Sequence, residues 1–171
     1  GSEPGALVEE LARRKAAAVA ASLEEPDERL VVGADTIVVL ADRILGKPRD
    51  EAEARSMLTA LSGRWHQVFT GVAVIDPVSG RTVSAHETTR VKFRCLAARG
   101  IAAYVATGEP LDKAGAYGVQ GKGALLVECI DGCFYNVVGL PLVKLAAVLR
   151  EFGFDVWEEG KGAGHGVSFD A

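Results

Sequence analysis

The first part of the chain alternates between a helical spacing of apolar residues and a continuous apolar run. Apolar residues four and seven positions apart predict a helix over residues 7–22. The run at 30–40 predicts a buried strand, interrupted at Asp35 and Thr36. Residues 43–49, which contain a glycine and a proline, predict a loop. The predicted buried stripe of the helix consists of Leu7, Leu11 and Ala18.

Asp50 marks the beginning of a second predicted helix. Glu53 follows three residues later, and together they form the sequence signature of a capping box. Gly63 suits the end of this helix, because glycine readily adopts the left-handed conformation that is common there. Its apolar face would consist of Ala54, Met57, Leu58 and Leu61.

Alternating and β-branched residues predict a long hairpin in the middle of the chain. Its strands are 68–75 and 82–93, and the residues at 76–80 are typical of a turn. A short helix is predicted at 97–106. It is followed by a glycine-rich loop at 111–123 that would contain a short strand.

The last third of the chain carries a strong turn signal. The Asp-Gly pair at 131–132 favours a type I′ turn and predicts a second hairpin, with strands 124–130 and 133–138. A proline at its first position predicts a final helix over 141–152. An edge strand is expected at 154–157.

Composition sets the size and class of the protein. With 171 residues, 49% of them hydrophobic and 25% charged, the chain can bury one core. Helices mixed with strands in one sheet system indicate the α/β class. We expect a single domain over 1–158 and a glycine-rich, flexible tail over 159–171.

Charge and hydropathy narrow the range of partners. The net charge is −4 and no long basic run is present, which argues against a nucleic-acid-binding protein. No apolar stretch approaches the roughly 20 residues that cross a bilayer, so no membrane partner is expected. The three cysteines lack the spacing of a disulfide framework, which favours a reducing cytoplasm.

Asp35 is the first candidate site residue. Its neighbours in the apolar run are valine, alanine and isoleucine, and a carboxylate in such surroundings needs a partner or a metal ion. It can act as a general base or as a metal ligand where the strand bends. The alternative is a structural aspartate that caps the next turn.

Two loops offer contacts for an anionic ligand. Lys47 lies between a glycine and a proline and is suited to bind a phosphate, although a surface lysine in a turn shows the same pattern. The loop at 108–121 combines four glycines with Asp112, Lys113 and Gln120. It can surround a ligand with backbone and polar groups, and a plain surface loop is the alternative.

The same three places carry a family resemblance. The strings GADT, GKP and GEPLDKAGAYGVQG occur in this order. On these motifs, residues 7–152 resemble the Maf family, the septum-formation-inhibitor proteins that act as nucleoside triphosphate pyrophosphatases.

The resemblance implies an α/β fold with two lobes, a mixed sheet, flanking helices and a central cleft, similar to inosine triphosphate pyrophosphatase. The implied reaction converts a nucleoside triphosphate and water to the monophosphate and pyrophosphate, with Mg²⁺ or Mn²⁺ as the cofactor. The resemblance further implies a homodimer and a link to the arrest of cell division.

The resemblance also implies roles for single residues. Asp35 would be the proton acceptor and a metal ligand, while Lys15 and Lys47 would contact phosphates. Thr36 and Gln120 occupy positions of nucleotide specificity, and this pair resembles the branch that acts on dTTP and UTP. Further loop contacts would come from Asp112 and Lys113.

One feature that the resemblance implies is not found in the sequence. It is an initial strand followed by an SxSPRR-like loop that binds phosphates, whereas Arg13 and Arg14 lie within the first predicted helix. We expect such a segment to be encoded ahead of Gly1. The alternative is a catalytically impaired nucleotide-binding or division-regulating protein that has lost this loop.

Overall fold

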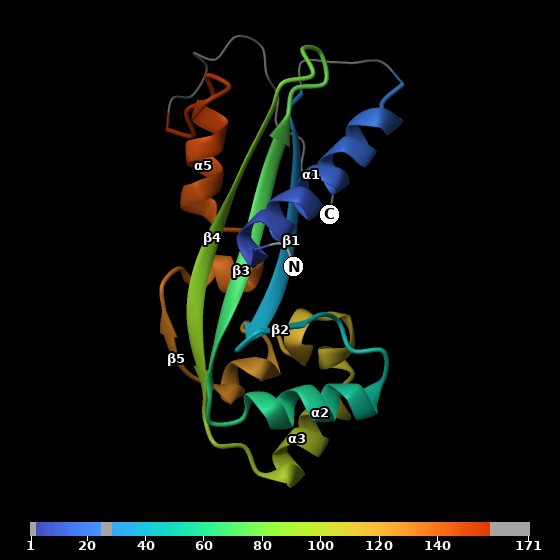
Figure 1. Cartoon of the computed structure of the whole chain (residues 1–171), viewed down its shortest axis with the longest axis vertical. Helices are drawn as coiled ribbons and strands as arrows, with labels where there is room; N and C mark the ends of the chain where they lie inside the picture. The colour runs from blue at the N-terminus through green and yellow to red at the C-terminus, as the bar shows by residue number, and fades with distance from the viewer. Residues whose placement is uncertain (1–2, 25–28, 158–171) are drawn as a thin grey trace. The chain divides into compact units, whose positions relative to one another are not determined.

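Five strands form one sheet, accompanied by helices, in the computed structural model of the chain (Figure 1). The structure describes residues 3–24 and 29–157, so the predicted tail at 159–171 lies outside it. The strands follow the order β2-β1-β3-β4-β5 across the sheet, and the predicted α/β class is confirmed. The strands are β1 (Val31–Leu40), β2 (Arg43–Leu45), β3 (Trp65–Ile75), β4 (Thr82–Phe93) and β5 (Val127–Asp131).

Five α-helices and three 3₁₀ helices connect these strands within the described part of the chain. None of the helices described is both long and apolar enough to cross a membrane. The α-helices are α1 (Pro4–Ser22), α2 (Glu51–Leu61), α3 (Ala98–Val105), α4 (Phe134–Val138) and α5 (Leu142–Arg150). The 3₁₀ helices are η1 (Glu109–Asp112), η2 (Ala114–Ala116) and η3 (Lys122–Leu126).

The chain divides into two compact units, each with a core of its own, in agreement with the two expected lobes. The central cleft between the lobes stays a prediction. The first unit consists of Gly1–Asp35, Thr70–Glu87 and Leu140–Ala171. The second unit consists of Thr36–Phe69 and Thr88–Gly139.

In the first unit, the sheet packs between α1 and α5. Val31 and Ala73 pack on Ala12 and Ala16 of α1. Because successive side chains of a strand point to opposite faces, the intervening residues contact α5 instead. The core on that face includes Val32, Val72, Val74, Leu145, Val148 and Leu149.

Glycines in the sheet allow α1 to approach closely. A Cβ on Gly33 would lie 2.4 Å from the carbonyl oxygen of Ala12, and one on Gly71 would lie 2.3 Å from that of Val8. Small side chains therefore face the sheet, and the predicted stripe is wrong. The fully buried residues of α1 include Val8, Ala12 and Ala16, whereas Leu7 and Leu11 are only partly buried and Ala18 is exposed.

The second unit has its core around Phe93. His66 and Tyr117 pack edge to face against the Phe93 ring, with ring centroids 5.0 and 4.7 Å away. Helices α2 and α3 cover this centre with apolar side chains. They contribute Ala54, Leu58, Leu61, Ile101, Tyr104 and Val105.

The predicted cap of α2 is confirmed, with one change of partner. The Asp50 carboxylate accepts a hydrogen bond from the Glu53 N–H at 2.8 Å. The Glu53 carboxylate reaches back to the N–H of Arg49, also at 2.8 Å, rather than to that of Asp50. The first turn of α2 is thereby tied to the end of the loop that carries Lys47.

The composition of residues 43–49 predicted a loop, but part of this segment is a strand. Arg43–Leu45 forms strand β2, which pairs antiparallel with β1 and places Leu45 opposite Val38. Strand β1 itself continues through Asp35 and Thr36 without a break. Strand pairing uses backbone groups, which every residue has. The polar side chains of Asp35 and Thr36 therefore do not interrupt the extended conformation of β1.

The predicted second hairpin, over 124–138, is also wrong. Its first strand is reduced to β5, which pairs antiparallel with β4, and its second strand is the short helix α4. Asn136 of α4 is buried and donates hydrogen bonds to the carbonyl oxygen of Val68 and to Thr89 Oγ1, both at 3.0 Å.

Two smaller predictions fail in the same way. The loop at 111–123 contains turns of 3₁₀ helix and no short strand, and 154–157 does not form an edge strand. Near the end of the described chain, the Phe154 N–H donates to the carbonyl oxygen of Leu149 and the Trp157 N–H donates to Asp155 Oδ1, so these donors are satisfied without a neighbouring strand.

Candidate functional site

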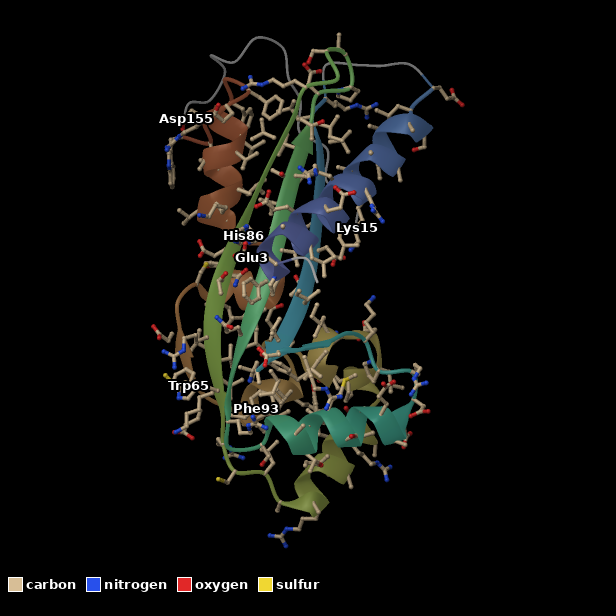
Figure 2. All side chains as sticks on the ribbon, in the orientation of Figure 1. Glu3, Lys15, Trp65, His86, Phe93 and Asp155 are labelled. Carbon is tan, nitrogen blue, oxygen red and sulfur yellow. The ribbon has the colours of Figure 1, made fainter. Side chains whose placement is uncertain are left out.

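Asp35 and Lys15 form an ion pair in the first unit. Lys15 Nζ lies 2.5 Å from Asp35 Oδ1 and donates a hydrogen bond to the carbonyl oxygen of Ala34 at 3.0 Å. The two-residue period of β1 places Asp35 on the same face as Gly33, against which α1 packs. Lys15 lies on α1 and extends to β1 to make these contacts (Figure 2). The expectation that Asp35 needs a partner is confirmed.

The pair differs in exposure, which bears on its chemistry. The Asp35 side chain is 19% exposed and the Lys15 side chain 59%. A largely enclosed carboxylate at the edge of solvent can accept a proton from a nearby water molecule. The exposed ammonium group beside it can contact an anion while it orients the carboxylate.

In the second unit, the two predicted ligand loops meet. The N–H of Gly115 donates a hydrogen bond to the carbonyl oxygen of Gly46 at 3.0 Å. Gly115 has a φ of +69°, and a Cβ there would lie 2.9 Å from the Val38 side chain, so only glycine fits. This contact joins the GKP loop, and with it Lys47, to the loop that carries Asp112 and Lys113.

The charged side chains of these two loops interact with one another. Lys113 Nζ lies 3.0 Å from Asp112 Oδ1. The hydrogen bond and charge of Lys113, and more weakly the charge of Lys47, hold the pKa of Asp112 below its usual value. Lys113 also lowers the pKa of Glu109 through its charge, so Lys113 and Lys47 lie among two carboxylates of this loop.

A pocket of about 320 Å³ lies beside Lys47 in the second unit. Arg43 and Arg49 also line it, although Arg49 is engaged by Glu53 at 2.9 Å. Sequence reasoning assigned no role to either arginine, and their position around the GKP string was the available signal. Apolar walls complete the pocket through Leu40, Ile44, Leu45, Met57 and Ala60.

The two residues expected to select the nucleotide both belong to the second unit. Gln120 is exposed and lies within the segment 118–123. Thr36 is partly buried, and its Oγ1 lies 3.5 Å from the position that a Cβ on Gly139 would occupy. That Thr36 and Gln120 face one pocket stays a prediction.

Sequence reasoning also assigned no role to Glu109 and Tyr104. Glu109 lies in the GEP part of the motif, and its carboxylate accepts a hydrogen bond from the Tyr104 hydroxyl at 2.9 Å. A carboxylate next to a glycine-rich loop was the only signal for this contact. The pairing depends on the packing of α3, which the sequence pattern does not reveal.

A metal ion bound at Asp35 stays a prediction. In residues 3–24 and 29–157, no group of three or more His, Cys, Asp and Glu side chains is arranged to hold a metal. Asp35 offers a single carboxylate. Mg²⁺ is commonly held by one or two carboxylates together with substrate phosphates, and Asp35 meets that minimum.

Comparisons with known proteins establish the family of the chain. The family described as Maf-like protein matches residues 1–152. A dTTP/UTP pyrophosphatase of Pelotomaculum thermopropionicum is 54% identical over 156 residues, covering 91% of this chain and 80% of that protein. A protein of the same name from Moorella thermoacetica is 57% identical over 154 residues, covering 90% and 78%. The chain therefore belongs to the Maf family.

Proposed function

We propose that the protein hydrolyses nucleoside triphosphates, dTTP and UTP above others, to the monophosphate and pyrophosphate. Its high identity to two proteins named dTTP/UTP pyrophosphatase supports this activity. The structural observation that carries it is the Asp35–Lys15 ion pair at the edge of solvent. A protein that only binds nucleotides is not favoured, because these relatives are named as enzymes.

In the proposed reaction, water attacks the α-phosphorus and the bond to the β-phosphate oxygen breaks. Asp35 accepts the proton of the attacking water. Lys15 orients the Asp35 carboxylate through their 2.5 Å contact and presents its charge to the substrate. Lys47 offsets part of the roughly four negative charges of the triphosphate.

A divalent ion, Mg²⁺ or Mn²⁺, is part of the proposal. Asp35 would hold it together with the phosphates of the substrate. The bound ion would neutralise charge that develops on the phosphate oxygens. Lys15, which contacts the same carboxylate, orients Asp35 in either role.

The proposal places the protein in the cytoplasm as a homodimer. All three cysteines, Cys95, Cys129 and Cys133, are free thiols, which suits a reducing compartment. The homodimer and the link to cell division rest on the family resemblance alone.

The first test is the Asp35→Asn substitution. The side chain keeps its shape but cannot accept a proton, so turnover should fall by about 10²–10⁴, the usual range for a general base. Release of pyrophosphate from dTTP with Mg²⁺ measures this. The matched control is Asp155→Asn, which removes the charge of another carboxylate in the first unit, 3.4 Å from Arg150. Turnover within a few-fold of the parent would exclude Asp35 as the base.

The second test is substrate choice. A glutamine amide offers a donor and an acceptor, which complement the O4 carbonyl and the N3–H that dTTP and UTP share. CTP lacks this pair, so kcat/KM should rank dTTP and UTP above CTP, and CTP above purine nucleotides. Gln120→Glu should erode the preference because it removes the donor. A preference for a purine triphosphate or for 7-methyl-GTP would contradict the role of Thr36 and Gln120.

A further inference from the structure

The Glu109 carboxylate accepts hydrogen bonds from the backbone of the segment that contains Gln120. Glu109 Oε2 accepts a hydrogen bond from the N–H of Lys122 at 2.9 Å, and Glu109 Oε1 accepts one from the N–H of Gly123 at 2.9 Å. The Tyr104 hydroxyl donates to the same Oε1 at 2.9 Å. Three donors thus converge on one side chain, and they all come from the second unit.

Tyr104 closes this arrangement on the other side of Gln120. Its hydroxyl accepts a hydrogen bond from the N–H of Gly118 at 3.2 Å while it donates to Glu109. The segment 118–123 is therefore held at both ends, and Gln120 lies between the two points of attachment. We call Glu109 and Tyr104 the clasp.

The protonation states of the clasp match these hydrogen bonds. Burial alone would raise the pKa of Glu109, but the N–H groups of Gly123 and Lys122 and the Tyr104 hydroxyl hold that pKa below its usual value. Burial raises the pKa of Tyr104, so its hydroxyl stays a donor. The carboxylate is the acceptor and the phenol the donor throughout the neutral range of pH.

The glycines at 121 and 123 pack closely against the clasp, with no room for a side chain. A Cβ on Gly123 would lie 2.3 Å from the carbonyl oxygen of Gly118 and 2.6 Å from Tyr104 Oη. A Cβ on Gly121 would lie 2.6 Å from Glu109 Oε2. The backbone thus lies directly against the two side chains, and a change in either one is transmitted to Gln120.

We propose that Glu109 and Tyr104 are positioning residues that hold the segment 118–123 and so set the orientation in which Gln120 selects the nucleotide base. The inference rests on the proposed function, which supplies the role of Gln120. Neither clasp side chain needs to touch substrate, because both act through backbone N–H groups. Selection by an amide depends on its placement, so loosening the segment should weaken discrimination before it weakens the phosphate chemistry.

The test uses Tyr104→Phe and Glu109→Gln in the full chain. Tyr104→Phe removes one hydroxyl, and Glu109→Gln turns an amide NH₂ group toward a backbone donor. Matched controls are Tyr135→Phe, at a side chain that is 52% exposed, and Glu128→Gln, which pairs with Lys92 at 2.8 Å. Two quantities are measured for each protein: the ratio of kcat/KM for dTTP to that for CTP, and amide hydrogen exchange at 118–123 without nucleotide.

We expect both clasp variants to lower the dTTP:CTP ratio by about tenfold or more, through a higher KM for dTTP, with kcat for CTP unchanged. Exchange of the Gly118, Lys122 and Gly123 amides should become faster in the same variants and stay unchanged in the controls. An unchanged ratio, or an equal loss on both nucleotides, would overturn the proposal. A parent protein that releases no pyrophosphate from any triphosphate would instead contradict the proposed function.

Discussion

On helix α1, three consecutive basic residues have different partners. Arg13 and Arg14 both pair with Glu10 on their own helix, at 3.0 and 2.8 Å, and their side chains are exposed. Lys15 turns to the sheet and pairs with Asp35. Pairs between exposed residues of one helix contribute little to stability, so the first two are a solvated face and the third is a candidate for chemistry.

Replacing the candidate phosphate contacts tests this distinction at the residue scale. Lys15→Ala and Lys47→Ala should each cost about 1.5–3 kcal/mol of transition-state stabilisation, the range for hydrogen bonds to charged groups. That corresponds to a loss of about 10–150-fold in kcat/KM for dTTP. Lys92→Ala is the control, because Lys92 also pairs with a carboxylate, Glu128, at 2.8 Å. Equal and small losses at all three positions would make Lys15 and Lys47 ordinary surface residues.

At the scale of elements, close packing governs how α1 meets the sheet. Gly33 and Gly71 remove the side chains that would hold the helix away, and Ala12 and Ala16 fill the remaining space. The position of Lys15 follows from this contact. A helix held further out would move its ammonium away from the Asp35 carboxylate.

Gly33→Ala should disturb this contact. The added Cβ would meet backbone atoms of α1 at 2.4 and 2.8 Å, which cannot yield by rotating a side chain. We expect a loss of about 1–3 kcal/mol in the free energy of unfolding, typical of overpacking. Urea unfolding monitored by circular dichroism measures it.

The control for that substitution is a glycine with open space around it. Gly100 lies in α3, and a Cβ there would have no neighbour within 4 Å. Gly100→Ala should therefore stabilise the protein by about 0.5–1 kcal/mol, because alanine favours the helix. If Gly33→Ala were as benign as Gly100→Ala, α1 would not depend on the close approach.

For the molecule as a whole, one buried histidine links stability to pH. His66 is 3% exposed and lies 2.8 Å from the Tyr117 hydroxyl through its Nε2. Burial lowers its pKa from 6.5 to about 4. The folded protein therefore keeps His66 neutral at pH values where the unfolded chain would bind a proton.

The sign of the effect follows from that shift. Below pH 6.5 the unfolded chain binds a proton at His66, whereas the folded protein does so only near pH 4. The free energy of unfolding is therefore unaffected by His66 above pH 6.5 and falls between pH 6.5 and 4, by about 3 kcal/mol in total. The free energy of unfolding, measured from pH 7 to pH 4, should fall more steeply for the parent than for His66→Phe. Parallel curves for the parent and His66→Phe would contradict this account.

Several features of the fold follow from local sequence alone. The hairpin strand Thr82–Phe93 and helix α2 were predicted within a residue of their ends, because turn residues and the Asp50 cap act over a few positions. The second hairpin failed because a strand needs a partner. β4 provides one for β5, while the buried hydrogen bonds of Asn136 stabilise α4.

The candidate site also has some features that the sequence predicts and others that depend on tertiary contacts. Residue types and loop composition were sufficient to predict Asp35, Lys47 and Gln120 as candidates, and the family resemblance added Lys15. Only the tertiary structure decided that Lys15 is the partner of Asp35, because this depends on the glycines that admit α1. It also decided that Glu109 and Tyr104 hold the segment around Gln120. Local propensity acts through near neighbours in the chain, whereas such contacts join distant residues and arise only when the core closes.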